Sequence, residues 1–143
     1  RALLEVLGTP LHVGPLGAGA AMKLVANSTL GALMTALGEA VALADSLGLD
    51  LHTTLDVLAD SPIGVTTRSK RAHVESGTYP ARFKLAHASK DLRLVSEAAS
   101  RAGCTLHLAP AARAWFDAAL AAGWGDLDYS AVIAHIRRRP ARG

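Results

Sequence analysis

The chain has 143 residues, a length that suits a single domain in which about two-thirds of the unfolded surface becomes buried. Half of the residues are hydrophobic but only 4% are aromatic, so Ala, Leu and Val must build most of the core. The formal net charge is +3, yet setting aside Arg137, Arg138, Arg139 and Arg142 leaves −1 for the rest. The basic charge is therefore a solvated terminal tail, which argues against binding to nucleic acid or to a membrane surface.

The first part of the chain predicts one long helix behind a short lead-in. Residues 1–7 are typical of the end of a helix, residues 11–13 of a short strand and residues 14–19 of a turn. From about residue 18 to residue 47, apolar residues recur every three or four positions, which predicts about 45 Å of helix. Gly31 and Gly38 lie inside this helix and predict close contact with another helix.

Shorter helices are predicted for the rest of the chain. Gly48 should end the long helix, and Asp50 should begin the next. Trp115 and Phe116 are expected to anchor one helix to the core, and Asp128 or Ser130 to cap the last. The predicted ranges are 50–59, 64 to about 75, 83–102, 111–122 and 131 to about 138. The fold class is all-α, a helical bundle around one long N-terminal helix.

Composition also limits the compartment and the chemistry. Cys104 is the single cysteine, which excludes an intrachain disulfide and a cysteine-based metal site, and it is expected to be buried. The histidines show no metal-ligand spacing, so no metal is expected. The longest apolar candidate is interrupted by Lys23, Asn27, Glu39 and Asp45, and the first residues do not resemble a signal peptide. A cytoplasmic protein is expected.

Two polar residues on the long helix form the candidate active site. Lys23 and Asn27 are four residues apart, so their side chains lie one turn apart on one face of the helix, behind Gly17 and Gly19. An ammonium can donate or accept a proton if its pKa is lowered, and a carboxamide can donate to and accept from a hydroxyl. The pair suits the interconversion of an alcohol and a carbonyl.

Three blocks of sequence resemble one family. The residues Gly17-x-Gly19-x-x-x-Lys23-x-x-x-Asn27 are similar to the start of the C-terminal helical domain of the β-hydroxyacid dehydrogenases. This family includes 3-hydroxyisobutyrate dehydrogenase and tartronate semialdehyde reductase, and is related to 6-phosphogluconate dehydrogenase. The second block is Phe83 followed by Lys90-Asp91-Leu92, and the third runs from Gly123 to Ile133. The blocks occur in the family's order.

The resemblance implies a role for each candidate residue. Lys23 would be the catalytic general acid and base, and Asn27 and Gly19 would bind a small β-hydroxyacid or its semialdehyde. Lys90 and Phe83 would lie near the nicotinamide of NAD or NADP. Because Lys90 and Asp91 are adjacent on a helix and point about 100° apart, they are not expected to pair with each other. Ser28 stands where the family commonly has a second Asn, and His87 and Ser89 where it tends to be apolar, which leaves their roles open.

The resemblance also implies a missing half. Residues 1–13 resemble the end of an N-terminal Rossmann domain, and residues 14–143 a substrate and dimerisation domain with a basic tail at 137–143. The absent sheet would hold most of the cofactor, so this chain alone is expected to be inactive, and to form a homodimer through the long helix. Two alternatives stay open: an imine reductase of the same fold, which typically lacks the helix lysine, and an all-α dimerisation module without activity. The sequence does not distinguish NAD from NADP or one hydroxyacid from another.

Overall fold

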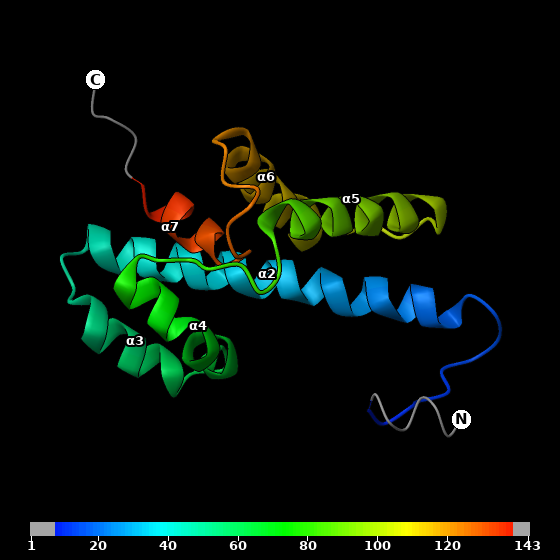
Figure 1. Ribbon diagram of the computed structural model, residues 1–143, viewed down its shortest axis with the longest axis horizontal. Coiled ribbons are helices and arrows are strands. Elements are labelled where there is room, and N and C mark those ends of the chain that lie inside the picture. Colours follow the sequence, from blue (N-terminus) through cyan, green and yellow to red (C-terminus); the bar gives the residue numbers. More distant parts are fainter. Residues whose placement is uncertain (1–7, 139–143) are drawn as a thin grey trace.

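The computed structural model describes residues 8–138 and shows helices packed along one long helix (Figure 1). The expectations for residues 1–7 and for the tail beyond Arg138 lie outside the described residues. The helices are α2 (Ala18–Ser46), α3 (Leu51–Ala59), α4 (Gly64–Ser76), α5 (Leu85–Arg101), α6 (Leu108–Ala121) and α7 (Ala131–Arg137). No strand forms among the described residues, so the predicted all-α bundle is confirmed.

Local sequence accounts for where the helices begin and end. Gly17 precedes α2 with a backbone φ of 94°, a left-handed conformation that glycine adopts without steric cost. The side chain of Asp50 accepts a 2.8 Å hydrogen bond from the backbone N–H of Thr53, which caps α3. Gly48 follows the end of α2 with a φ of 75°, as the sequence predicts.

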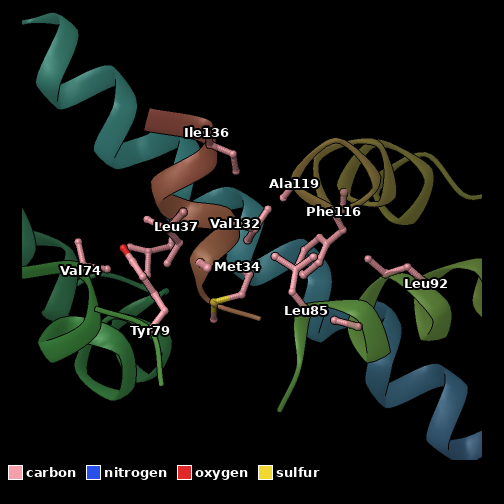
Figure 2. Close-up of a cluster of buried hydrophobic side chains, with 14 of the residues drawn as sticks. Met34, Leu37, Val74, Tyr79, Leu85, Leu92, Phe116, Ala119, Val132 and Ile136 are labelled. Carbon is pink, nitrogen blue, oxygen red and sulfur yellow. The ribbon is translucent and has the colours of Figure 1, made fainter. Parts of the chain in front are cut away.

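The helix α2 is the central element of the bundle (Figure 1). α5, α6 and α7 pack against it, and the α3–α4 pair lies near its C-terminal end. Figure 2 shows Met34 and Leu37 of α2 in one cluster with Leu85 of α5, Phe116 of α6 and Val132 of α7. Phe116 is fully buried, and Trp115 beside it is partly buried and donates from Nε1 to the carboxylate of Glu39 at 2.9 Å. Both therefore anchor α6 to the core.

The two internal glycines of α2 allow close contact within the chain. A Cβ at Gly31 would lie 2.7 Å from Cδ2 of Leu92 in α5, and a Cβ at Gly38 would lie 2.7 Å from Cδ1 of Ile136 in α7. The prediction of close helix contact is confirmed. Since the contacts are made to α5 and α7 of the same chain, these glycines are not part of an exposed dimer surface.

Four expectations about local structure are wrong. Residues 11–13 form no strand, because no neighbouring strand in the described part offers them backbone hydrogen bonds. Phe83 lies before α5, which begins at Leu85. Cys104 is exposed, because it follows the end of α5 rather than lying on its inner face. Arg137 does not belong to a free tail, since α7 extends through it and its Nε donates to Asp45 at 2.7 Å.

By length and composition alone, α2 could cross a membrane, with a mean hydropathy of 1.3 over 18 residues. Lys23, Asn27, Glu39 and Asp45 interrupt the apolar residues of this helix. One third of the window is buried, and the helix packs against five others along its length. A core helix of a helical bundle has the same properties, so the finding is weak evidence for a membrane span.

Candidate functional site

The first half of α2 carries three of the predicted site residues along one stripe. Gly19, Lys23 and Asn27 follow one another at intervals of four residues, so each lies one turn beyond the last. Gly19 and Lys23 are exposed, and Asn27 is partly buried. Open space surrounds the position that a Cβ at Gly19 would occupy. Lys23 has no hydrogen-bond or ion-pair partner among residues 8–138, so its ammonium is free to contact a ligand.

A buried carboxylate on α5 fixes Asn27. Asp91 is only 5% exposed, and its Oδ2 accepts a 2.8 Å hydrogen bond from Nδ2 of Asn27. Because a carboxylate can only accept, the amide nitrogen of Asn27 must face Asp91. The second amide hydrogen and the carbonyl oxygen of Asn27 remain able to contact a ligand. Asn27 is thus held in one orientation, with one donor and one acceptor available.

Lys90 joins the same cluster, contrary to the expectation that it would not pair with Asp91. Its Nζ lies 3.1 Å from Oδ1 of Asp91, and half of its side chain is exposed. Adjacent residues do point in different directions on a helix, but the flexible four-carbon stem of lysine can fold back across the helix surface. Asp91 therefore connects the α2 stripe to Lys90, a contact that the spacing of these residues in the sequence does not predict.

Phe83 approaches from the segment before α5. Its ring is partly buried and meets Tyr129 edge-on, with ring centroids 5.6 Å apart. His87, one turn into α5, is exposed and lies 6.0 Å from the Phe83 ring. The printed contacts of the Phe83 ring are thus to Tyr129 and His87, whereas Asn27 and Lys90 both contact Asp91.

The two serines whose roles were open are used locally. The hydroxyl of Ser28 donates to the backbone oxygen of Val25 at 2.7 Å, within α2 itself. Ser89 is buried, and its hydroxyl donates to Asp117 of α6 at 2.6 Å. Neither hydroxyl is directed to the Lys23–Asn27 stripe, so these two contacts serve helix structure and helix packing.

Sequence reasoning missed a second polar centre, which surrounds Asp128. This carboxylate is fully buried and lies 3.0 Å from Nζ of Lys70, which is itself buried. Burial alone raises the pKa of Asp128, but hydrogen bonds from Ser130, Lys70 and the backbone of Arg82 outweigh it and lower the pKa to about 2. Asp128 and Ser130 were recognised only as possible helix caps. Nothing in the sequence of α4 marks Lys70 as a buried residue, so only the packing of α4 against α7 reveals the pair.

Several grooves of the described part lie beside α2. One of about 340 Å³ runs between α2 and α3 and is lined by apolar residues that include Leu43, Leu47 and Val57. Another of about 550 Å³ lies beside residues 105–109. A third of about 380 Å³ is lined by neighbours of Lys23 and Asn27 on α2, including Leu24 and Ser28, and by Val95 of α5. Among residues 8–138, no group of three or more His, Cys, Asp or Glu side chains is placed to hold a metal ion.

The family resemblance assigns Phe83 and Lys90 to the nicotinamide end of a dinucleotide. Phe83 offers an aromatic face, and Lys90 a half-exposed cation, near the start of α5. A dinucleotide's phosphates are typically held by a glycine-rich turn between a strand and a helix. Residues 8–138 contain no such unit, since the turn before α2 follows no strand. Residues 8–138 therefore lack the kind of unit that holds the phosphates of a dinucleotide.

The sequence matches one family model over most of its length. Residues 17–136 match the family described as "NAD-binding of NADP-dependent 3-hydroxyisobutyrate dehydrogenase". Glyoxylate/succinic semialdehyde reductase 1 of Arabidopsis thaliana is 36% identical over 138 residues, which cover 93% of this chain and 47% of the relative. A probable 3-hydroxyisobutyrate dehydrogenase of Mycobacterium tuberculosis is 34% identical, with 97% of this chain and 50% of the relative covered.

Solved structures give the same result for the fold. The 3-hydroxyisobutyrate dehydrogenase of Mycobacterium tuberculosis, solved with L-serine, superposes with a TM-score of 0.82 at 30% identity. The superposition covers 96% of this chain and 50% of that protein. The Salmonella typhimurium 3-hydroxyisobutyrate dehydrogenase has a TM-score of 0.77 at 34% identity, covering 82% of this chain and 42% of that protein. The chain spans about half the length of the relatives that it matches.

Proposed function

Because this chain belongs to the 3-hydroxyisobutyrate dehydrogenase family, we propose that it is the helical part of an NAD(P)-dependent oxidoreductase that acts on a small β-hydroxyacid or its semialdehyde. Residues 14–143 would form the substrate and dimerisation domain. Residues 1–13 would be the end of a Rossmann domain that holds the phosphates and adenosine of the cofactor. The twofold greater length of the relatives supports this arrangement.

The observation that carries the proposal is the pairing of Asn27 with Asp91 one turn from Lys23. When bound, NAD(P)H supplies the hydride for reduction of a carbonyl, and the oxidised form accepts one in the reverse direction. Lys23, which has no partner in residues 8–138, donates a proton to the carbonyl oxygen during reduction and removes the hydroxyl proton during oxidation. Asn27 uses its available donor and acceptor to align the same substrate.

The other candidate residues surround this pair. Gly19 leaves open space one turn before Lys23, where a substrate can approach the helix backbone. Lys90 and Phe83 lie on the cofactor side, as a cation held by Asp91 and an aromatic face held by Tyr129. The NAD(P) dependence of the family supports this assignment.

We also propose a cytoplasmic homodimer. With Gly31 and Gly38 committed to α5 and α7, the surface available for self-association is the exposed apolar side of α2, where Leu43 and Leu47 lie beside Leu49 and Val57. These four residues are each more than half exposed, and a second copy would bury them. No contact with nucleic acid or membrane is required by this function.

The test is a turnover assay on the full-length protein. Purified protein is mixed with NADH or NADPH and a panel containing glyoxylate, succinic semialdehyde, other short semialdehydes and a cyclic imine. We expect the wild type to oxidise the cofactor when a semialdehyde is present. The Lys23→Ala variant should fold normally but should lose this activity. Turnover of the imine alone would favour the imine reductase alternative. Absence of both turnover and cofactor binding would favour the dimerisation module.

A further inference from the structure

The carboxylate of Asp128 is surrounded by donors from three parts of the fold. Its Oδ1 lies 3.0 Å from Nζ of Lys70 in α4, and accepts from Oγ of Ser130 at 2.6 Å and from the Ser130 backbone N–H at 3.1 Å. Its Oδ2 accepts from the backbone N–H groups of Arg82 at 3.2 Å and Phe83 at 3.3 Å. One oxygen therefore faces α4 and the start of α7, and the other faces the segment that leads into α5.

Backbone hydrogen bonds reinforce this connection along both segments. The N–H of Asp128 donates to the carbonyl of Tyr79 at 3.0 Å, and the N–H of Tyr129 donates to the carbonyl of Phe83 at 2.8 Å. The N–H of Leu85 donates to the carbonyl of Leu127 at 2.9 Å. Residues 79–86 and 124–130 are thus bonded at several points, with the Asp128 carboxylate at the centre.

Phe83 is the residue most constrained by this arrangement. Its N–H is bonded to Asp128 and its carbonyl to Tyr129, so both of its backbone polar groups are fixed. The Tyr129 ring packs against one side of the Phe83 ring and limits its movement. The Tyr129 ring is in turn contacted by Lys70, whose Nζ lies 4.3 Å from the ring centre. The position of the Phe83 ring therefore depends on the same buried ion pair.

We propose that Asp128 is a positioning residue for the cofactor side of the site. By accepting the N–H groups of Arg82 and Phe83, it fixes the Phe83 ring and the start of α5, the helix that carries Lys90 and Asp91. The proposal rests on the proposed function for the role of Phe83 at the nicotinamide. In this proposal the Asp128 side chain does not itself contact the substrate.

Only a carboxylate serves both sides of this centre. An amide has one accepting oxygen, and its NH₂ would face either Lys70 Nζ and the Ser130 backbone N–H or the backbone N–H groups of Arg82 and Phe83, all of which can only donate. Asp128→Asn keeps the size of the side chain and removes half of its accepting capacity. Asp126→Asn is the matched control, because Asp126 belongs to the same segment and accepts from Lys84 at 2.7 Å, but its side chain is 92% exposed.

The experiment measures cofactor binding and local opening in the full-length protein. The Kd for NADH and for NADPH is determined by calorimetry, the exchange of the Phe83 amide hydrogen by NMR, and KM and kcat by turnover. For Asp128→Asn we expect faster exchange of the Phe83 amide, a rise of about tenfold in the Kd and KM of the better-bound cofactor, and a smaller change in kcat. Asp126→Asn should match the wild type in all of these.

A double variant separates positioning from general damage. If Asp128 acts through Phe83, adding Asp128→Asn to Phe83→Leu should raise the Kd little beyond the effect of Phe83→Leu alone. Fully additive effects would overturn the proposal, as would an unchanged Kd together with faster amide exchange. If Asp128→Asn does not fold, Ser130→Ala replaces it, because it removes one donor from Oδ1, and an unchanged Kd there overturns the proposal equally.

The outcomes also distinguish this proposal from the proposed function. A wild-type protein that binds neither NADH nor NADPH contradicts both. A wild type that binds and turns over a semialdehyde, with an unchanged cofactor Kd in Asp128→Asn, contradicts the role of Asp128 alone. A wild type that binds the cofactor without turnover, with a raised Kd in the variant, supports the role of Asp128 and contradicts the proposed reaction.

Discussion

The side-chain amide of Asn27 donates a 2.8 Å hydrogen bond to the carboxylate of Asp91, which lies 64 residues later in the chain. This bond crosses the interface between α2 and α5 and connects two of the three sequence blocks that carry the family resemblance. It explains why a carboxamide one turn after Lys23 has a fixed orientation. It also explains why the adjacent Lys90–Asp91 pair belongs to the same site, since Asp91 contacts both neighbours.

Removing the Asp91 carboxylate should weaken both folding and substrate alignment. In Asp91→Leu the Asn27 amide loses its acceptor, which should lower the free energy of unfolding by about 1–3 kcal/mol. Lys90→Met removes only the half-exposed ion pair, so its effect should be below about 1 kcal/mol. Urea denaturation of both variants gives the comparison. An equal decrease in the free energy of unfolding of the two variants would show that the Asn27–Asp91 hydrogen bond is not the stabilising contact.

An alanine at Gly31 should destabilise the bundle. The added methyl would lie 2.7 Å from Cδ2 of Leu92, so α2 and α5 must separate or Leu92 must leave its position. We expect a loss of about 1–3 kcal/mol, larger than the gain in helix propensity of up to about 1 kcal/mol. The control is Gly19→Ala, where no atom lies within 4 Å and stability should stay equal or rise. Thermal unfolding of both variants tests this, and a stabilised Gly31→Ala would contradict the packing.

Asp128 should make the protein sensitive to acid. The pKa of Asp128 is lowered from its usual 3.8 to about 2, so its contribution to stability is complete above pH 3.8 and is lost as the pH falls through about 2. This contribution is about 2 kcal/mol. Urea denaturation at pH values across this range should show that Asp128→Asn is less stable than the wild type near neutral pH. The difference should shrink in acid, and a difference independent of pH would refute the assignment.

A substitution that keeps the positive charge of Lys23 separates its role in proton transfer from the effect of its charge. Lys23→Arg keeps the positive charge but cannot readily exchange a proton, so turnover of the full-length enzyme should fall by about 10²–10⁴-fold, as in Lys23→Ala. Stability should be unchanged because Lys23 is exposed. Asn27→Ala should have a smaller effect on turnover and should weaken substrate binding. Near-normal turnover of Lys23→Arg across the pH range would leave Lys23 with a binding role only.

The proposed dimer predicts a specific effect of charge on α2. Light scattering of the chain should give twice the monomer mass at high micromolar concentration. Leu43→Lys places a charge on the exposed apolar side of α2, where Leu43 is 61% exposed, and should shift the protein to monomer without unfolding it. Lys23→Ala, on the first half of the helix, serves as the control. A wild type that is monomeric at these concentrations would contradict the dimer.

The sequence predicts the helices, because hydrophobic spacing and glycine or aspartate at the helix ends are local signals. It predicted α2 closely, the cap at Asp50 and the family to which the chain belongs. It also identified Lys23 and Asn27 as neighbours, since four residues make one helical turn. The expected strand at residues 11–13 failed because a strand depends on a partner elsewhere in the chain.

Which polar groups are buried together depends on the packing of the helices. The partners of Asp91 and Asp128 come from helices distant in sequence, and no periodicity in the chain indicates that Asn27 faces Asp91 or that Lys70 faces Asp128. The same holds for Gly31 and Gly38, whose small size predicts close contact with another helix but does not identify Leu92 and Ile136 as the neighbours. Helix periodicity indicates which side of a helix is apolar, whereas the identity of the neighbour depends on how the helices pack.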